Sequence, residues 1–151
     1  MIKEAVTIRK ARVEEIKSLR HSVLWPHLES IDQCEIAPDR LESTFHVAAF
    51  IGDKIVGTST FIVDINANFE EKNQYRLRAM ATAPEVRGWG VGARIIEEAE
   101  KELRQKAIKL LWCDARLIAT GFYEKQNFKM KGEVYQVPKI GPHKLMYKEI
   151  K

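Results

Sequence analysis

Arg87-Gly88-Trp89-Gly90-Val91-Gly92 holds three glycines at alternate positions, just after one apolar run and just before a long amphipathic segment. Glycine has no Cβ, so it adopts positive φ readily and lets backbone N–H groups approach a ligand closely. The first N–H groups of a helix have no partner within the helix and carry the positive end of its dipole. We therefore expect this turn to bind phosphate, with the charge of Arg87 aiding the same anion. A glycine-rich connection without any ligand is the alternative, because short glycine motifs also match by chance.

The segments on either side of this turn predict a strand, a helix and a second strand. Gln74–Thr82 alternates apolar and polar residues as a strand does, and Pro84 closes it. Val91–Ala107 places its apolar residues on one helical face, and Ile108–Cys113 is a short apolar run typical of a buried strand. Strand, helix and strand in this order predict a βαβ unit with parallel strands, whose first turn is the anion site.

The rest of the chain has the pattern of one α/β domain over residues 1–151, without a linker or a repeat. A helix is expected from Val13 to its end at Pro26, and a second short helix at Ile118–Gln126. Further strands are expected at Ala5–Arg9, Phe45–Ile51, Ile55–Ile65, Lys131–Val137 and Lys144–Ile150. Connections are expected at Leu28–Leu41 with a short helix after Pro38, at the hairpin Gly52-Asp53-Lys54, and at the loop Pro138–His143.

Composition restricts the class of protein. The 151 residues are 45% hydrophobic and 30% charged, which suits one globular domain with a real core. No apolar run approaches the roughly 20 residues of a membrane span, so we expect no membrane partner. The net charge of +4 suits an anionic cofactor or substrate, and no dense Lys/Arg tract points to nucleic acid. Cys34 and Cys113 are expected to be free buried thiols of a cytoplasmic protein, and no metal is expected.

Two stretches of the chain resemble motifs of the GNAT superfamily of N-acetyltransferases. Thr82–Gly92 resembles motif A, whose core is Arg/Gln-x-x-Gly-x-Gly/Ala. Ala119–Phe128 resembles motif B, usually Ala-x-x-x-Tyr-x-x-x-Gly-Phe, with Asn127 in place of the glycine. Asparagine also tolerates the left-handed conformation that a helix C-cap needs. The resemblance implies an α/β (α+β) fold: a mixed, mostly antiparallel sheet with a central splayed pair of parallel strands, flanked by helices.

Five further segments resemble the glyphosate N-acetyltransferase branch of that superfamily. The resemblance covers most of the chain and implies acetyl-CoA as co-substrate, with direct attack by a small-molecule amine in a ternary complex. Glyphosate itself is not expected to be the natural substrate. The protein is expected to be a monomer or a homodimer. The segments are Leu19–Pro26, Leu77–Thr82, Leu111–Arg116, Gly132–Val134 and Gly141–Lys148.

The same resemblance implies where acetyl-CoA binds. Its pantetheine arm is expected to pair with strand backbone, as an added strand would. An N–H group near Ala81 is expected to face the thioester carbonyl and stabilise developing negative charge there. The implied residues are Met80, Ala81 and Thr82 for pantetheine, and the backbone of Arg87, Gly88, Trp89, Gly90, Val91 and Gly92 for the pyrophosphate.

Acyl transfer to an amine needs a base for the amine and an acid for the departing thiolate. The resemblance implies Tyr123 as the acid and His143 as the base. An ordinary imidazole titrates near pH 6.5, which suits the removal of a proton at neutral pH. The alternatives are that Tyr123 is a core aromatic, that His143 is a solvated loop residue, and that water is the base.

Three residues are candidates for binding the acceptor. Arg78 and Arg116 match positions that hold substrate anions in the resembling branch, and guanidinium suits bidentate pairing with carboxylate or phosphonate. Trp25 stands where the branch has a basic residue, which favours one anionic group beside an aromatic wall. The predicted acceptor is an amino acid or an analogue. Ordinary surface ion pairs are the alternative role for both arginines.

Rival functions stay open on the sequence alone. The glycines and Asp114 faintly resemble a dinucleotide-binding fold, but the third glycine comes one residue early and a second mononucleotide half is missing. A basic domain that binds nucleic acid lacks support from interleaved aromatic and basic residues. A CoA- or nucleotide-binding module without catalysis, and an acetyltransferase for a protein or amino-sugar amine, complete the alternatives.

Overall fold

The structure is a computed structural model that describes residues 5–151. Two compact units divide the described chain. The first comprises residues 5–63 and 77–102, and the second comprises residues 64–76 and 103–151. The single domain that the sequence predicts over residues 1–151 stays a prediction.

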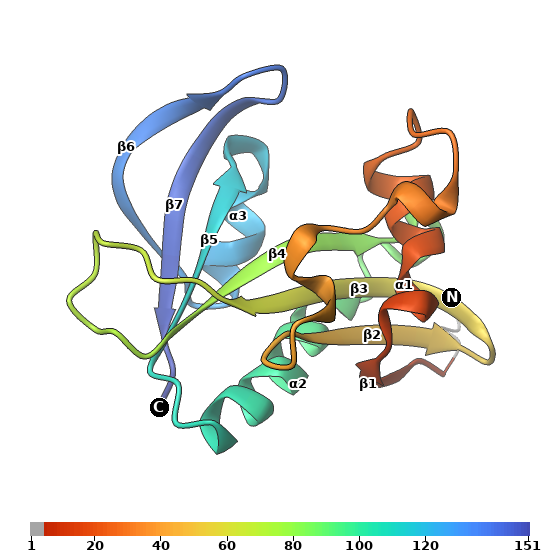
Figure 1. Ribbon diagram of the computed structural model, residues 1–151, viewed down its shortest axis with the longest axis horizontal. Coiled ribbons are helices and arrows are strands. Elements are labelled where there is room, and N and C mark those ends of the chain that lie inside the picture. The colour runs from red at the N-terminus through yellow and green to blue at the C-terminus, as the bar shows by residue number, and fades with distance from the viewer. Residues whose placement is uncertain (1–4) are drawn as a thin grey trace. The chain divides into compact units, whose positions relative to one another are not determined.

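Seven strands form one mixed sheet in the order β1-β2-β3-β4-β5-β7-β6 (Figure 1). β4 and β5 run parallel, whereas β1–β2, β2–β3, β5–β7 and β6–β7 pair antiparallel. The predicted mixed, mostly antiparallel sheet with a central parallel pair is confirmed. The strands are β1 Thr7–Ala11, β2 Phe45–Ile51, β3 Lys54–Val63, β4 Gln74–Thr82, β5 Leu110–Arg116, β6 Lys129–Val137 and β7 Gly141–Glu149, and the helices are α1 Val13–Leu19, α2 Val91–Gln105 and α3 Thr120–Lys125.

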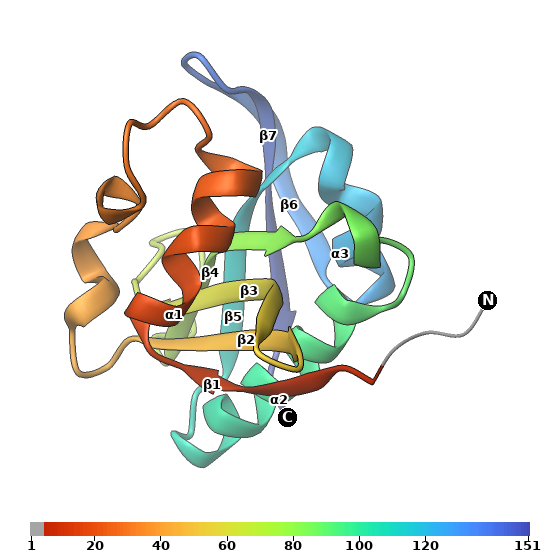
Figure 2. The same ribbon diagram turned by 90° about the vertical axis from the view of Figure 1, so that its right-hand side faces the viewer.

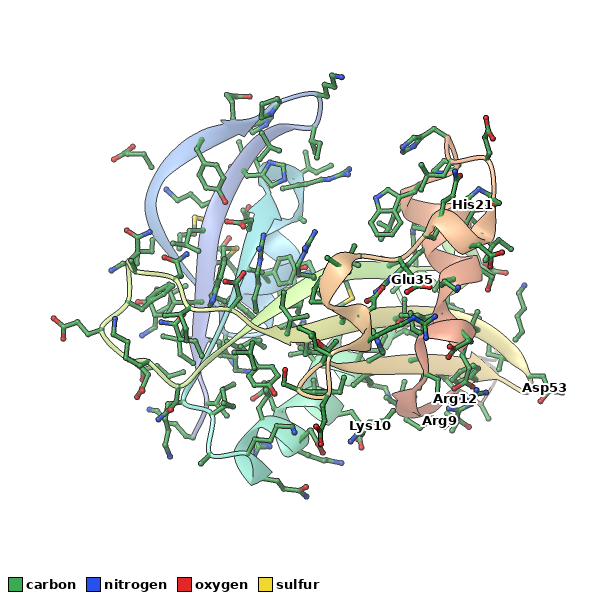
Figure 3. The ribbon with its side chains drawn as sticks, viewed as in Figure 1. Arg9, Lys10, Arg12, His21, Glu35 and Asp53 are labelled. Carbon is green, nitrogen blue, oxygen red and sulfur yellow. The ribbon has the colours of Figure 1, made fainter. Side chains whose placement is uncertain are left out.

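In the first unit, α1 and α2 cover opposite faces of β2 and β3 (Figure 2). Val13 and Ile16 of α1 pack on Ala48 and Phe50 of β2, which share one face because strand side chains alternate. The apolar face predicted for α2 is buried, with Ile95, Ile96, Ala99 and Leu103 at most 1% exposed. The predicted hairpin joins β2 to β3 at Gly52, whose φ is +58°, and Asp53 lies at its tip (Figure 3).

The helix predicted to reach Pro26 changes character before it ends. It is α-helical only to Leu19, and Arg20–Leu24 forms one wider π-helical turn. The Trp25 N–H donates across that turn to the Arg20 carbonyl at 2.9 Å. Such a turn widens the helix locally, which changes the direction in which the following residues leave it.

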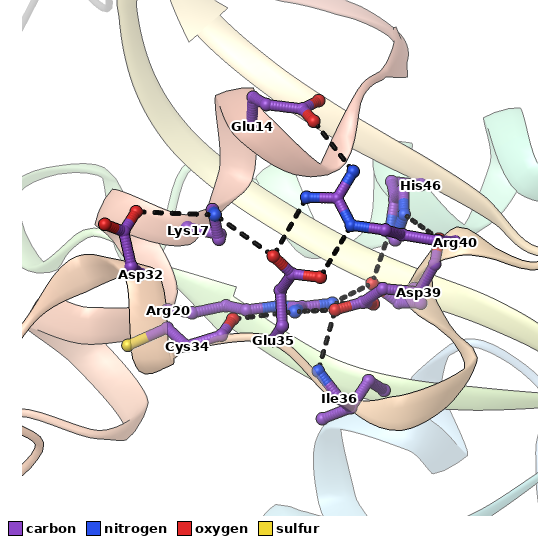
Figure 4. A network of polar contacts seen from close by, with 11 residues as sticks. Glu14, Lys17, Arg20, Asp32, Cys34, Glu35, Ile36, Asp39, Arg40 and His46 are labelled. Carbon is purple, nitrogen blue, oxygen red and sulfur yellow. Dashed lines mark hydrogen bonds and ion pairs between the residues drawn. The ribbon is translucent and has the colours of Figure 1, made fainter.

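A buried ion pair organises the segment between this turn and β2 (Figure 4). The fully buried guanidinium of Arg20 donates to both oxygens of Asp39 at 2.7 and 2.8 Å, and also to the Cys34 carbonyl at 2.9 Å and Thr60 Oγ1 at 2.7 Å. At the surface above it, Glu35 accepts from Lys17 and Arg40. A bidentate pair with added hydrogen bonds satisfies charges that would otherwise be costly to bury.

The second unit is built on β5, β7, β6 and the start of β4. Its apolar core joins Phe69 to Leu110 and Trp112 on β5 and Leu145 on β7. The connection predicted over Pro138–His143 is wrong at its end, because β7 begins at Gly141 and so includes His143. Asn127 follows α3 with a φ of +69°, which confirms the left-handed conformation predicted there.

Other predicted boundaries move by a few residues. The first strand is Thr7–Ala11 rather than Ala5–Arg9, and the short second helix divides into a 3₁₀ turn at Leu117–Ala119 and α3. Cys34 and Cys113 are both free and buried, as predicted. No helix among residues 5–151 is both long enough and apolar enough to span a membrane.

Candidate active site

The glycine turn of the first unit presents an uncapped helix start. The Gly90 carbonyl accepts the Arg94 N–H at 3.1 Å, so Gly90 is the residue that precedes α2 and has no side chain to cap it. The first turn of α2 also contains no acidic residue. The N–H groups that begin α2 are therefore available to an anion, and the positive end of the helix dipole adds to the attraction.

The space around the turn fits a phosphate. Gly88 and Gly90 have φ of +84° and +78°, and a Cβ placed on either would meet no atom within 4 Å. Arg87 is exposed and Trp89 is half-buried beside them. Gly92 differs from the other two glycines, because it is buried within the first turn of α2. The residues present thus fit the diphosphate of a CoA molecule.

β4 of the first unit is irregular at the residues predicted to bind substrate and pantetheine. Ala79 has a φ of +53°, which interrupts the regular alternation that the sequence predicts around Arg78. Arg78 is half-buried, and its carbonyl accepts from Ser59 Oγ at 3.1 Å. The parallel ladder with β5 ends at Arg76, whereas β4 continues through Met80–Thr82. The backbone of Met80–Thr82 therefore lies beyond the paired stretch of β4 and β5.

In the second unit, three side chains occupy paired positions on neighbouring strands. Arg116 of β5 lies directly opposite His143 of β7, and His143 lies directly opposite Tyr135 of β6. Directly opposed residues of antiparallel strands point to the same face of a sheet. The structure therefore brings Arg116 and His143 together, as the predicted roles require, and adds Tyr135 beside them.

His143 is oriented by a backbone contact. Its Nδ1 lies 2.9 Å from the Gly141 carbonyl, and the side chain is 7% exposed. A carbonyl only accepts, so in the neutral ring Nδ1 carries the proton and Nε2 carries the lone pair. The alternative of a solvated loop histidine is wrong, because His143 is a buried strand residue. A lone pair held on Nε2 is the form that a general base requires.

A polar cluster on the same face was missed by sequence reasoning. Asp114 accepts from the Tyr135 hydroxyl at one carboxylate oxygen and from Arg76 at the other, where the distance is 2.6 Å. Arg76 also donates to Asp64 at 3.1 Å, and its guanidinium lies 4.7 Å from the centre of the Trp112 ring. These partners are far apart in sequence, and only the strand register brings them together.

Tyr123 is buried on the other face of β5. Its ring packs edge to face against Phe122 and Phe128, with centroids 5.0 and 5.3 Å away. Burial raises the pKa of the Tyr123 phenol above its usual range, and the neighbouring Cys113 thiol raises it further. Cys113 alternates with Asp114 along β5, so Tyr123 and His143 lie on opposite faces of that strand. The phenol keeps its proton at neutral pH, as a general acid must before it acts.

Trp25 lies in the first unit, where the Arg20 network positions it. Its ring is half-buried, and the Arg20 guanidinium lies 5.8 Å from the ring centre. The Trp25 carbonyl also accepts the Leu28 N–H at 3.1 Å. The Trp25 indole is therefore partly exposed, and its backbone is held by hydrogen bonds at both the N–H and the carbonyl.

The sequence profile of the Acetyltransferase (GNAT) family matches residues 10–128. The chain belongs to this family. The uncharacterized N-acetyltransferase YitI of Bacillus subtilis (strain 168) is 33% identical over 144 residues, which cover 95% of this chain and 96% of that protein. The chain is thus a GNAT N-acetyltransferase, an enzyme that acts on an amine with acyl-CoA.

Solved structures share the fold at low sequence identity. An aminoglycoside 6'-N-acetyltransferase complexed with coenzyme A has a TM-score of 0.78 and 17% identity, over 96% of this chain and 97% of that one. Escherichia coli ElaA has a TM-score of 0.75 and 17% identity, over 96% of this chain and 100% of that one. At these identities the likeness concerns the fold alone.

Proposed function

We propose that this enzyme transfers an acetyl group from acetyl-CoA to the amine of a small anionic acceptor, an amino acid or an analogue. The observation that carries the proposal is the direct pairing of Arg116 with His143 across β5 and β7. A guanidinium beside a histidine whose Nε2 holds a lone pair suits an acceptor that has both an acidic group and an amine. The segments that resemble the glyphosate N-acetyltransferase branch support the same acceptor class.

The chain's residues take separate roles in this reaction. Acetyl-CoA supplies a thioester-bound acetyl group when bound. The N–H groups from Arg87 to Gly92 hold its diphosphate, and backbone of Met80–Thr82 pairs with its pantetheine arm. The support in the first unit is the uncapped start of α2 and the stretch of β4 beyond its ladder with β5.

Three side chains of the second unit handle the acceptor and the protons. Arg116 binds the acidic group and so orients the acceptor, which contributes part of the rate by itself. His143 takes a proton from the acceptor's ammonium at Nε2, which leaves a neutral amine able to attack. Tyr123 holds a proton at its hydroxyl and serves as the acid. The acid serves the sulfur and the base serves the nitrogen.

Arg78 and Trp25, both in the first unit, are further residues that the sequence resemblance implies for acceptor binding. Arg78 matches a position that holds a substrate anion in the resembling branch. Trp25 replaces a basic residue of the resembling branch, so it contributes an apolar surface rather than a charge. The acceptor that fits both residues carries one anionic group and an apolar side chain.

A thiol-release screen with acetyl-CoA tests the proposal. The panel holds amino acids, amino-phosphonates, amino sugars and polyamines, and we expect amino acids or their analogues to give the highest kcat/KM. Arg116→Ala should raise the KM for such an acid more than it lowers kcat, because the contact exists before and during the reaction. Polyamines or aminoglycosides as the best substrates, together with a harmless Arg116→Ala, would overturn the proposal.

A further inference from the structure

The face of the second unit that holds His143 also carries opposite charges close together. Arg116, His143 and Tyr135 share that face because they are directly opposed on β5, β7 and β6. Asp114 lies two residues before Arg116 on β5 and so points to the same face. Side chains of one strand two positions apart are neighbours on a sheet. The imidazole thus has a guanidinium on one side and a phenol bonded to a carboxylate on the other.

The Tyr135 hydroxyl is fixed as a donor to Asp114. A hydroxyl has one proton and two lone pairs, so a phenol that donates to a carboxylate keeps its oxygen lone pairs for another donor. Donation to an anion also polarises the hydroxyl and makes its oxygen a better acceptor. The rings of Tyr135 and His143 lie 6.1 Å apart between centroids, so one small ligand can contact both.

The two carboxylates beside this hydroxyl share one cation. Asp64 and Asp114 both pair with the guanidinium of Arg76. The carboxylate side chains are 39% and 31% exposed. A carboxylate that shares its cation attracts a cationic group at the Tyr135 end of the site, whereas Arg116 supplies the balancing positive charge at the other end.

His143 gives a second, independent reason to expect a ligand with N–H donors here. The side chain is more than nine-tenths buried, and its Nδ1 is occupied by the Gly141 carbonyl. Nε2 makes no hydrogen bond to any residue between 5 and 151. An accessible imidazole nitrogen that carries a lone pair and lacks a protein partner is suited to receive an N–H donor from a ligand.

We propose that Tyr135 receives the acceptor's ammonium group beside His143, and that Asp114 is the positioning residue that orients the Tyr135 hydroxyl. This inference rests on the proposed function and extends it from the acceptor's acidic group to its amine. One N–H of the ammonium donates to Tyr135 Oη and another donates to His143 Nε2. The second N–H bond then breaks as an N–H bond forms at Nε2, which leaves a neutral amine and an imidazolium.

This arrangement selects the spacing between the two groups of the acceptor. Directly opposed residues of an antiparallel pair have Cβ atoms about 4.5–5.5 Å apart. An ammonium held at Tyr135 and His143 and an acidic group held at Arg116 therefore belong to one small zwitterion. α-Amino acids fit this spacing, whereas amines without an acidic group contact Tyr135 and His143 but not Arg116.

Three probes with one carbon skeleton separate the two halves of the site. Phenylalanine has both groups, phenethylamine has only the ammonium, and 3-phenylpropionate has only the carboxylate. Binding of each is measured by calorimetry in the presence of CoA. Tyr135→Phe, which removes the hydroxyl and keeps the ring, should weaken phenylalanine and phenethylamine about tenfold, the loss expected for one hydrogen bond to a charged group, and leave 3-phenylpropionate unchanged.

Asp114→Asn tests the positioning role. It keeps an oxygen for the Tyr135 hydroxyl but removes the charge, so it should weaken phenethylamine and spare 3-phenylpropionate. A purely structural role would weaken both probes alike. The matched control is Tyr147→Phe on β7, a tyrosine that packs on Phe69 and should leave all three affinities unchanged.

Two results would overturn the assignment: phenethylamine binding that does not depend on Tyr135, or equal losses for phenethylamine and 3-phenylpropionate. Acetyl transfer to phenylalanine, followed in parallel by thiol release, separates this inference from the proposed function. If the predicted binding pattern holds and no thiol is released with any amino acid, the ammonium site stands and the proposed function fails.

Discussion

Gly57 of β3 lies directly beneath Val91, the first residue of α2. A Cβ added to Gly57 would come within 2.8 Å of Val91 Cγ1 and 3.0 Å of Ile95 Cδ1. A side chain there would have to displace the side chains of Val91 and Ile95, so glycine at this position allows the close approach of helix and strand. The glycine turn immediately precedes Val91, and the packing at Gly57 therefore helps to fix the start of α2.

Gly57→Ala should destabilise the protein by about 1–3 kcal/mol, the usual effect of overpacking, and weaken acetyl-CoA binding as the start of α2 shifts. Urea unfolding and calorimetry measure the two effects. Combining it with Val91→Ala removes the clashing methyl group and should recover part of the loss, a coupling that distant sites do not show. Equal stability of Gly57→Ala and the unmodified protein would contradict the close packing.

Gly90→Asp should abolish acetyl-CoA binding while the fold survives. The change places a carboxylate where the proposed diphosphate sits, and like charges repel. Gly52→Asp is the matched control, because Gly52 also has a positive φ and open space around it but lies in the β2–β3 hairpin. It carries the same backbone strain and should bind acetyl-CoA normally. Equal affinities of the two variants by calorimetry would remove the glycine turn from the binding site.

The features that the sequence predicts correctly depend on neighbouring residues. Gly88 and Gly90 take positive φ and Asn127 ends its helix in the left-handed region, because these preferences belong to the residues themselves. The buried face of α2 follows from its own periodicity. Local rules of this kind placed the glycine turn and most of the strands.

The features that the sequence missed depend on partners far along the chain. His143 lies in a strand because Arg116 and Tyr135 pair with it on either side. Glycine usually weakens the interior of a strand, and the sequence alone does not show that Val91 packs against Gly57. Ala79 adopts a positive φ that alanine rarely takes, and no local pattern signals it. Sheet register decides the place of His143, and helix packing decides the surroundings of Gly57.

The ion pairs of Glu35 should make stability depend on pH in the acid range. Bonds from Arg40 and Lys17 lower the pKa of Glu35 to about 2, whereas an unfolded glutamate titrates near 4.3. The unfolded state therefore binds more protons between these values, and the stabilisation present above about pH 4.3 is lost as the pH falls toward 2.

Glu35→Gln should accordingly be less stable than the unmodified protein at pH 7, with the difference shrinking below pH 4. Urea unfolding at several pH values measures the difference. Glu97→Gln on the exposed side of α2 controls for removal of one carboxylate. A difference for Glu35→Gln that stays constant down to pH 2.5 would show that the charge of Glu35 does not contribute.

His143→Ala should lower kcat and remove the limb of the pH–rate profile in which the rate rises with pH. The reason is that a base acts only in its unprotonated form, and His143 holds its lone pair at Nε2. His27→Ala, at an exposed histidine of the first unit, should keep the profile. A profile unchanged by His143→Ala would leave water as the base.

Tyr123→Phe removes the proposed acid and keeps the ring between Phe122 and Phe128. Loss of a general acid typically costs about 10²–10⁴-fold in rate, so kcat should fall by that factor while the affinity for acetyl-CoA stays unchanged. Burial raises the pKa of the phenol, so the hydroxyl stays protonated between pH 6 and 9 and the loss should not vary over that range.

The same variant decides between the two roles that the sequence leaves open for Tyr123. A core aromatic contributes packing, which phenylalanine supplies equally, so both kcat and the unfolding midpoint would stay at their original values. An acid contributes its proton, which phenylalanine lacks, so kcat would fall at an unchanged unfolding midpoint. Because the ring is 7% exposed and the change adds no volume, the two measurements separate chemistry from packing. Full turnover on the best acceptor of the screen would assign Tyr123 to the core.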